Sequence, residues 1–158
     1  MSNELKVGII ITNNQNDVLL IKERSRENTP LLWNIVKGSY GDEGKETIFE
    51  AAIRECKEEV GVEVVLTGLL GCYIARQTEK LRTQITFLAK IKKLSPRLAS
   101  KKDGLLRNEH IEELKWCTKE DVKKMKPKEF ISDRAYKILQ DWARGNSFPL
   151  ETVKQIKM

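Results

Sequence analysis

Three glutamates near the middle of the chain, Glu55, Glu58 and Glu59, have the residue type and spacing of a divalent-cation site. Glu58 and Glu59 follow Glu55 by three and four residues, so on a helix the three side chains lie on one face, about one turn apart. Like charges at this spacing repel by roughly 0.2–0.5 kcal/mol per pair, whereas a bound cation attracts all of them. Mg²⁺ prefers oxygen ligands and keeps several waters, so carboxylates and the phosphate oxygens of a substrate suit it.

A helix from Glu46 to Val60 is the element that must position these glutamates. Arg54 lies four residues after Glu50 and could hold it in an ion pair, which would leave the other carboxylates available to a metal. Gly61 stands where a left-handed C-cap is expected. The alternative to a metal site is a solvated, charged helix face. The apolar residues fall at helical spacing on one face: Ile48, Ala51, Ala52, Cys56 and Val60.

Taken with its neighbours, this helix resembles the signature of the Nudix hydrolase family, Gly-x5-Glu-x7-Arg-Glu-U-x-Glu-Glu-x-Gly-U, where U is bulky and aliphatic. The corresponding segment covers residues 38–62, and every fixed residue from Glu46 onward is present at the family spacing. The run from Trp33 to Gly38 resembles the stretch that leads into the signature. A downstream Glu-x-x-Glu-x-x-x-Trp segment also resembles the family: Glu109, Glu112 and Trp116.

Two features depart from the family pattern. Seven residues separate Gly38 from Glu46, two more than in the family. The family often uses the backbone carbonyl of this glycine as a metal ligand, so Gly38 or Gly41 could serve here, or neither. Cys56 occupies a position where the family has a bulky aliphatic residue, which a buried thiol can replace at a small packing cost.

The resemblance implies that Glu55, Glu58 and Glu59 bind Mg²⁺, with Mn²⁺ as an alternative ion and Gly38 as a further ligand. It also implies that Glu46 supports the site, by contacting Arg54 or the metal shell, and that Arg54 orients the glutamates. The general base could lie inside or outside the signature, and an outside carboxylate could equally be an ordinary surface acid. The candidates are Glu55 and Glu58 inside it, and Glu109 and Glu112 outside it.

The reaction implied by the resemblance is Mg²⁺-dependent hydrolysis of a diphosphate linkage in a nucleoside diphosphate derivative, such as a nucleoside di- or triphosphate. An alternative is an RNA 5′-end pyrophosphohydrolase, which only the basic charge favours. Another is a non-catalytic Nudix-fold module that senses a nucleotide, although such modules usually lose the glutamates retained here. Four aromatic residues could stack on a base but are more typical of a core: Trp33, Tyr73, Phe87 and Trp116.

Outside the signature, the order of elements predicts a mixed α/β fold, and the resemblance makes this an α/β/α sandwich in a single domain over residues 1–158. A last amphipathic helix is expected over about 132–145, and Thr118 with Asp121 can cap an earlier helix. The remaining strands are expected at Lys6–Thr12, Val18–Ile21, Val62–Leu70, Tyr73–Ala75, Gln84–Ile91 and Glu112–Cys117. Residues 22–30 and 95–108 read as loops. Basic residues in the second loop, Lys101, Lys102 and Arg107, could close over phosphates or simply be solvated.

The composition limits the partners and the compartment. A formal charge of +6 favours anionic partners, either phosphorylated small molecules or nucleic acid, or it serves solubility alone. No apolar run approaches the ~20 residues that span a bilayer, and the N-terminus lacks a secretory signal, so a cytoplasmic protein without membrane contact is expected. The three cysteines form no CxxC pair and are expected to be buried free thiols. A homodimer is common in the family and is expected as an alternative to a monomer.

Overall fold

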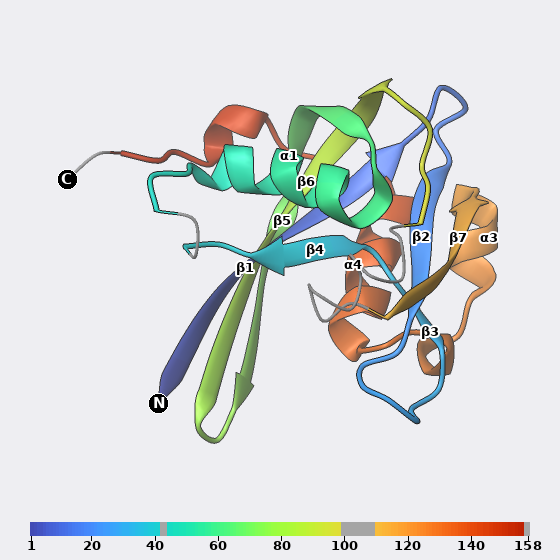
Figure 1. The fold of residues 1–158 in the computed structure, drawn as a ribbon, viewed down its shortest axis with the longest axis horizontal. Helices are drawn as coiled ribbons and strands as arrows, with labels where there is room; N and C mark the ends of the chain where they lie inside the picture. Colours follow the sequence, from blue (N-terminus) through green and yellow to red (C-terminus); the bar gives the residue numbers. More distant parts are fainter. Residues whose placement is uncertain (42–43, 99–109, 157–158) are drawn as a thin grey trace.

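The computed structural model describes residues 1–41, 44–98 and 110–156, and they form a mixed seven-stranded sheet between helices (Figure 1). The main strand order is β3-β2-β1-β6-β5, with β4 paired to β1 and β7 paired to β2. β1 and β6 run parallel, whereas the other pairs are antiparallel. The α/β fold class, with a mixed sheet between helices, is therefore confirmed.

The strands differ in length from the sequence-based expectation. β5 (Glu63–Gln77) and β6 (Lys80–Lys93) form one long hairpin that projects from the body, where two shorter strands and a separate third were expected. The pairing of β5 with β6 shifts register between Leu66 and Gly68 and between Leu69 and Gly71. These shifts bend β5 without ending it, which explains why the sequence suggests two shorter strands there. The other strands are β1 Ser2–Thr12, β2 Val18–Glu23, β3 Leu32–Asn34, β4 Val36–Ser39 and β7 Ile111–Cys117.

Two apolar cores lie on opposite faces of the sheet. Alternate residues of β1 point to opposite sides, so Ile9 and Ile11 pack against α1 (Ile48–Val60) and Ile10 packs toward α4 (Asp133–Ala143). All three isoleucines are fully buried. The smaller helical elements are α3 (Lys119–Lys124), which packs against α4, η1 (Pro127–Glu129), and η2 (Leu150–Thr152), which packs against β5. Thr118 and Asp121 form the expected capping box at the start of α3.

Helix α1 begins two residues later than expected. Thr47 is its N-cap, and the Thr47 hydroxyl accepts a hydrogen bond from the Glu50 amide at 3.1 Å. Glu46 therefore lies in the turn before the helix and not in its first turn. Gly61 ends the helix in the left-handed region, with φ of 70°, as expected for a glycine C-cap.

The expectation of three buried thiols is wrong for one of them. Cys56 and Cys117 are buried in the two cores, but Cys72 is exposed. Cys72 lies on the outer part of β5, and its neighbours Gly71 and Tyr73 are partly buried, so the side chain of Cys72 points outward by strand alternation.

In the part of the chain that the structure describes, no helix is long and apolar enough to cross a membrane.

Candidate active site

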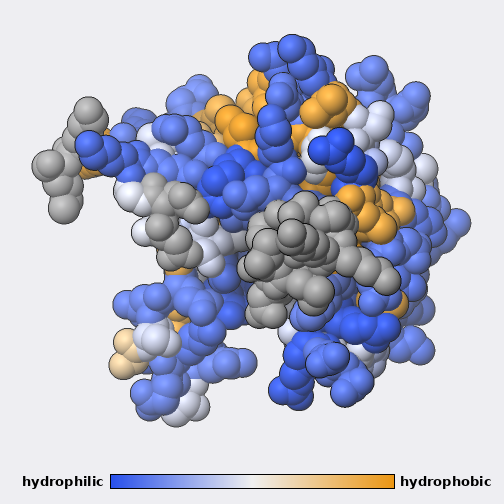
Figure 2. All heavy atoms as spheres, in the orientation of Figure 1, coloured by the Kyte–Doolittle hydropathy of each residue, from blue (hydrophilic) through white to orange (hydrophobic). Residues whose placement is uncertain are grey.

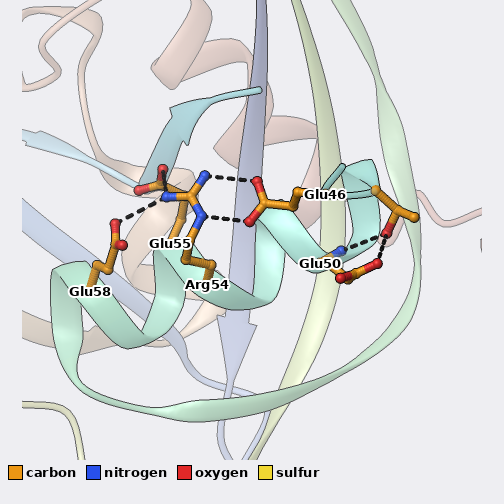
Figure 3. A network of polar contacts seen from close by, with 6 residues as sticks. Glu46, Glu50, Arg54, Glu55 and Glu58 are labelled. Atoms are coloured by element: carbon orange, nitrogen blue, oxygen red, sulfur yellow. Dashed lines mark hydrogen bonds and ion pairs between the residues drawn. The ribbon is translucent and has the colours of Figure 1, made fainter. Parts of the chain in front are cut away.

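Arg54 joins three carboxylates at the centre of the site (Figure 3). Its Nε and Nη2 atoms donate to both oxygens of Glu46, at 2.7 and 3.1 Å. Its Nη1 atom donates to Glu55 at 2.9 Å and to Glu58 at 3.1 Å. The expected ion pair between Arg54 and Glu50 is wrong. Glu50 instead meets the Thr47 hydroxyl at the start of α1, because the guanidinium turns toward the preceding turn, where Glu46 offers a bidentate contact.

The charges of this cluster are strongly coupled. The hydrogen bonds to Glu46 raise the pKa of the Arg54 guanidinium above its already high value, and the nearby charges of Glu55 and Glu58 add to the effect. The side chains of Arg54 and Glu46 are 23% and 13% exposed, so solvent screens the contact only in part. Arg54 is therefore a permanent cation that fixes the orientation of three acids.

Two signature glutamates do not lie on a solvated helix face. Glu55 and Glu59 are only 7% and 4% exposed and lie beside the core face of α1, next to the fully buried Cys56. Burial raises the pKa of the Cys56 thiol, and the charges of Glu59 and Glu55 raise it further. Burying a carboxylate is costly unless it is paired or binds a metal. The position of these two acids favours a functional interpretation over surface charge.

Gly38 lies directly against the carboxylate of Glu55, despite the longer loop that follows it. A Cβ built on Gly38 would overlap the carboxyl group of Glu55, so a larger residue at this position would force that carboxylate to move. β4 pairs with β1 in the register Val7 to Gly38, and this pairing fixes the glycine independently of the loop. A Cβ built on Gly41 meets no atom within 4 Å among the described residues beyond its chain neighbours. Of the two glycines considered from the sequence, Gly38 is therefore the one that adjoins the acids.

A second polar network, around Glu23, adjoins the site and was not anticipated from the sequence. Glu23 is buried and accepts hydrogen bonds from Asn34 at 2.9 Å and from the Lys37 amine at 2.8 Å. The backbone amide of Lys37 in turn donates to Glu59 at 3.4 Å. The sequence predicts a loop over residues 22–30, but β2 extends through Glu23. The available signal was alternation, which places residues 19, 21 and 23 on one side of that strand.

The candidate acids outside the signature are placed differently. Glu112 lies on β7, is half exposed, and contacts Arg24 at 3.4 Å. This contact with a surface arginine is the kind that an ordinary surface acid makes. Four further candidates lie outside the described residues: Lys101, Lys102, Arg107 and Glu109.

The aromatic residues considered as stacking platforms mostly belong to the cores. Phe87 is fully buried and packs on Phe49, with ring centroids 5.6 Å apart. Trp33 is buried in the core beneath α4, whereas Tyr73 and Trp116 are partly buried. The Tyr73 hydroxyl donates to Asp141 at 2.8 Å, a contact that fastens α4 to β5.

The carboxylates suit an open magnesium site better than a closed one. Over residues 1–41, 44–98 and 110–156, no group of three or more His, Cys, Asp or Glu side chains is placed so that it could hold a metal ion. Mg²⁺ commonly takes one or two carboxylates and keeps waters for the rest of its shell. Glu55, which lies against Gly38, and Glu58 and Glu59, nearby on α1, carry carboxylate oxygens, the kind of donor that Mg²⁺ prefers.

Comparison with known proteins gives this arrangement a family context. A model of the NUDIX domain matches residues 3–140. A NUDIX hydrolase from Nitrosomonas europaea has a similar fold, with a TM-score of 0.76 and 20% identity over 98% of each chain.

Two further solved structures with a similar fold are complexes. The NUDIX domain of Shewanella oneidensis NrtR, complexed with ADP ribose, has a TM-score of 0.66 at 15% identity, covering 91% of this chain and 88% of that chain. A C. elegans Ap4A hydrolase binary complex has a TM-score of 0.63 at 21% identity, covering 89% of this chain and 96% of that chain. At these identities the likeness shows the fold.

Proposed function

Because the chain belongs to the Nudix hydrolase family, we propose that it hydrolyses a diphosphate linkage in a nucleoside diphosphate derivative, in a reaction that depends on Mg²⁺. The chain is a Nudix pyrophosphohydrolase, an enzyme that acts on phosphorus-containing acid anhydrides. The observation that carries the proposal is the contact of Gly38 with the buried Glu55 carboxylate, beside an arginine that holds Glu46, Glu55 and Glu58. A small phosphorylated molecule as substrate agrees with the ADP ribose and Ap4A named for similar structures.

We assign the metal to the buried side of the cluster. Glu55, Glu58 and Glu59 would hold Mg²⁺, or Mn²⁺ in its place, together with the carbonyl of Gly38. When bound, the ion supplies neutralisation of the diphosphate charge and lowers the pKa of a water. Glu46 keeps Arg54 in position through two hydrogen bonds, so the guanidinium continues to orient the other acids.

The proton of the attacking water needs an accessible acceptor. The side chain of Glu58 is 36% exposed and that of Glu55 only 9%, so Glu58 is the better placed of the two to meet a water beside the substrate. Water attacks one phosphorus, the bond from that phosphorus to the bridging oxygen breaks, and the carboxylate takes the proton. The products are two phosphorylated fragments.

Three free cysteines, one of them exposed, support a reducing, cytoplasmic compartment.

The proposal is tested by measuring phosphate or pyrophosphate release from a panel of nucleotides and dinucleoside polyphosphates, with Mg²⁺ and with EDTA. We expect turnover in Mg²⁺ only. Glu58→Gln should reduce kcat by at least about 100-fold while leaving the far-UV CD spectrum unchanged. Glu50→Gln is the matched control, because Glu50 makes its hydrogen bonds with Thr47 at the helix cap and glutamine also suits that position. Full activity of the Glu58→Gln variant would exclude this carboxylate as the base, and full activity in EDTA would exclude the metal.

A further inference from the structure

The chain after α4 passes round the edge of the sheet and ends beside the start of α1. Figure 1 shows this C-terminal tail, residues 146–156, in red beside the teal start of that helix. The tail is fixed to the edge strand β5, because Phe148 and Leu69 exchange backbone hydrogen bonds of 2.8 and 2.9 Å. Beyond this bridge, Leu150 and Val153 pack against the core on the α1 face. The tail therefore leads from the α4 face of the sheet to the face on which the acid cluster lies.

One side chain of the C-terminal tail, Gln155, contacts both ends of the segment that carries Glu46. Its Oε1 atom accepts a hydrogen bond from the Ile48 amide at 2.7 Å, in the first turn of α1. Its Nε2 atom donates to the Tyr40 hydroxyl at 2.8 Å, two residues beyond Gly38. A single amide group thus bridges the start of the helix and the residue that follows β4.

Both partners of Gln155 are themselves held in place. The Tyr40 amide donates to the Leu5 carbonyl at 3.1 Å, and Tyr40 packs against the core on the α1 face. Ile48 is only 4% exposed. Its amide is one of the first four of a helix, which find no acceptor within the helix itself. Gln155 therefore supplies an acceptor where α1 needs one, and it ties that point to a second fixed residue.

Glu46 lies within the bridged segment, two residues before Ile48. It accepts two hydrogen bonds from Arg54, at 2.7 and 3.1 Å, and the same guanidinium donates to Glu55 and Glu58. A displacement of the helix start would therefore move Glu46 and change the orientation of Arg54. Through Arg54 the displacement would reach the two signature acids.

We propose that Gln155 is a positioning residue of the active site, which orients the acids by holding both ends of the segment around Glu46. Its hydrogen bonds go to Tyr40 and Ile48, so it acts on the acids through the backbone and Glu46. The proposal rests on the proposed function, because it concerns the acids assigned to Mg²⁺. Removing an outer contact of a metal site typically lowers metal affinity about 10–100-fold. The exposed position of Gln155 places its effect at or below the lower end of that range.

The exposure of Gln155 also makes it suitable for substitution. Figure 2 shows the end of the C-terminal tail as a narrow, mainly hydrophilic projection from the body. Replacing Gln155 should therefore leave both apolar cores intact, which an unchanged far-UV CD spectrum would verify. Lys154 is exposed on the same tail, so Lys154→Met is the matched control.

Mg²⁺ affinity is measured first, by calorimetry without substrate. Gln155→Met keeps the length of the side chain and removes both hydrogen bonds, so it should weaken Mg²⁺ binding about three- to tenfold. Gln155→Glu should restore the native affinity, because a carboxylate accepts from the Ile48 amide and from the Tyr40 hydroxyl and suits a helix start. Salt at about 0.15 M screens the added charge. Lys154→Met should bind Mg²⁺ as the native chain does.

Turnover is measured second, as a function of Mg²⁺ concentration, with the nucleotide that the native enzyme hydrolyses best. In Gln155→Met the Mg²⁺ concentration for half-maximal rate should rise by the same factor as the Kd, while KM for the nucleotide stays unchanged. Tyr40→Phe removes one of the two hydrogen bonds and should give a smaller rise. In EDTA, Gln155→Met and Glu46→Gln should lower the Tm by less together than the sum of their separate effects, because both act on Arg54.

Native Mg²⁺ affinity in Gln155→Met would overturn the inference, as would an equal loss in Lys154→Met or a failure of Gln155→Glu to restore binding. An equal fall in rate at every Mg²⁺ concentration, or strictly additive changes in Tm, would also overturn it, since either result indicates a general loss of stability. Mg²⁺ binding that depends on Gln155 in a chain that hydrolyses no nucleotide would support the positioning role and refute the proposed function.

Discussion

Replacing Arg54 with methionine should destabilise the protein by about 3 kcal/mol, because it removes the one cation shared by three acids. Methionine keeps the length of the side chain and the helix propensity, so the change isolates the charge and the hydrogen bonds. Breaking a buried ion pair by removing one partner costs about 3–5 kcal/mol. The lower end applies here, since Arg54 is 23% and Glu58 36% exposed and solvent takes over part of their solvation.

The assay is thermal unfolding of Arg54→Met and the native chain, in EDTA and in Mg²⁺. For a chain of 158 residues, about 3 kcal/mol corresponds to a decrease in Tm of about 6–12 °C. Mg²⁺ should raise the Tm of the variant more than that of the native chain, because the ion replaces the missing positive charge.

Lys57→Met provides the control on the same helix. Lys57 is 63% exposed and contacts Glu63 at 3.4 Å, so its loss should cost less than about 0.5 kcal/mol. Equal decreases in Tm for the two variants would show that Arg54 is an ordinary surface residue. A decrease that is the same in EDTA and in Mg²⁺ would refute the link between the arginine and the metal.

Three further outcomes are expected. Gly38→Ala should displace the Glu55 carboxylate and weaken Mg²⁺ binding, measured by calorimetry, because the new Cβ would overlap that carboxyl group; an unchanged affinity would contradict the contact. At pH 8 a maleimide should label Cys72 much faster than the two buried thiols, whose pKa values are raised by burial; labelling at three equal rates would contradict the packing. Glu4 has a folded-state pKa of about 2, below the ordinary 4.5, so its stabilising contribution is complete above pH 4.5 and is lost as the pH falls toward 2. In Glu4→Gln the free energy of unfolding should therefore fall less between pH 4.5 and 2 than in the native chain, by less than about 1 kcal/mol because the side chain is a third exposed. An unchanged pH dependence of the free energy of unfolding would exclude the effect.

The sequence was most informative where local rules decide the structure. The spacing of Ile48, Ala51, Ala52, Cys56 and Val60 defines the buried face of α1, and Gly61 ends it as a glycine C-cap does. The same local pattern gave the cap of α3. Helical spacing brings Glu55, Glu58 and Glu59 together with no knowledge of the rest of the chain.

Contacts between distant segments were less predictable. Arg54 has Glu50 one turn away on the helix, but it pairs with Glu46, which reaches it only because the chain turns before Thr47. Glu23 meets Lys37 only once β2 and β4 are in place, and strand pairing is not fixed by local sequence. The extent of β5 was also missed, because bends at its glycines resemble strand ends in the sequence.

The fixed position of Gly38 has a consequence for the loop that follows it. β4 holds one end of this loop, and the contact of Glu46 with Arg54 holds the other. The positions of the acids therefore do not depend on how many residues the loop contains. Doubling a flexible loop costs only about 0.6 kcal/mol in closure entropy. A short peptide tag inserted after Gly41 would therefore give this enzyme a label beside its active site without altering the site itself.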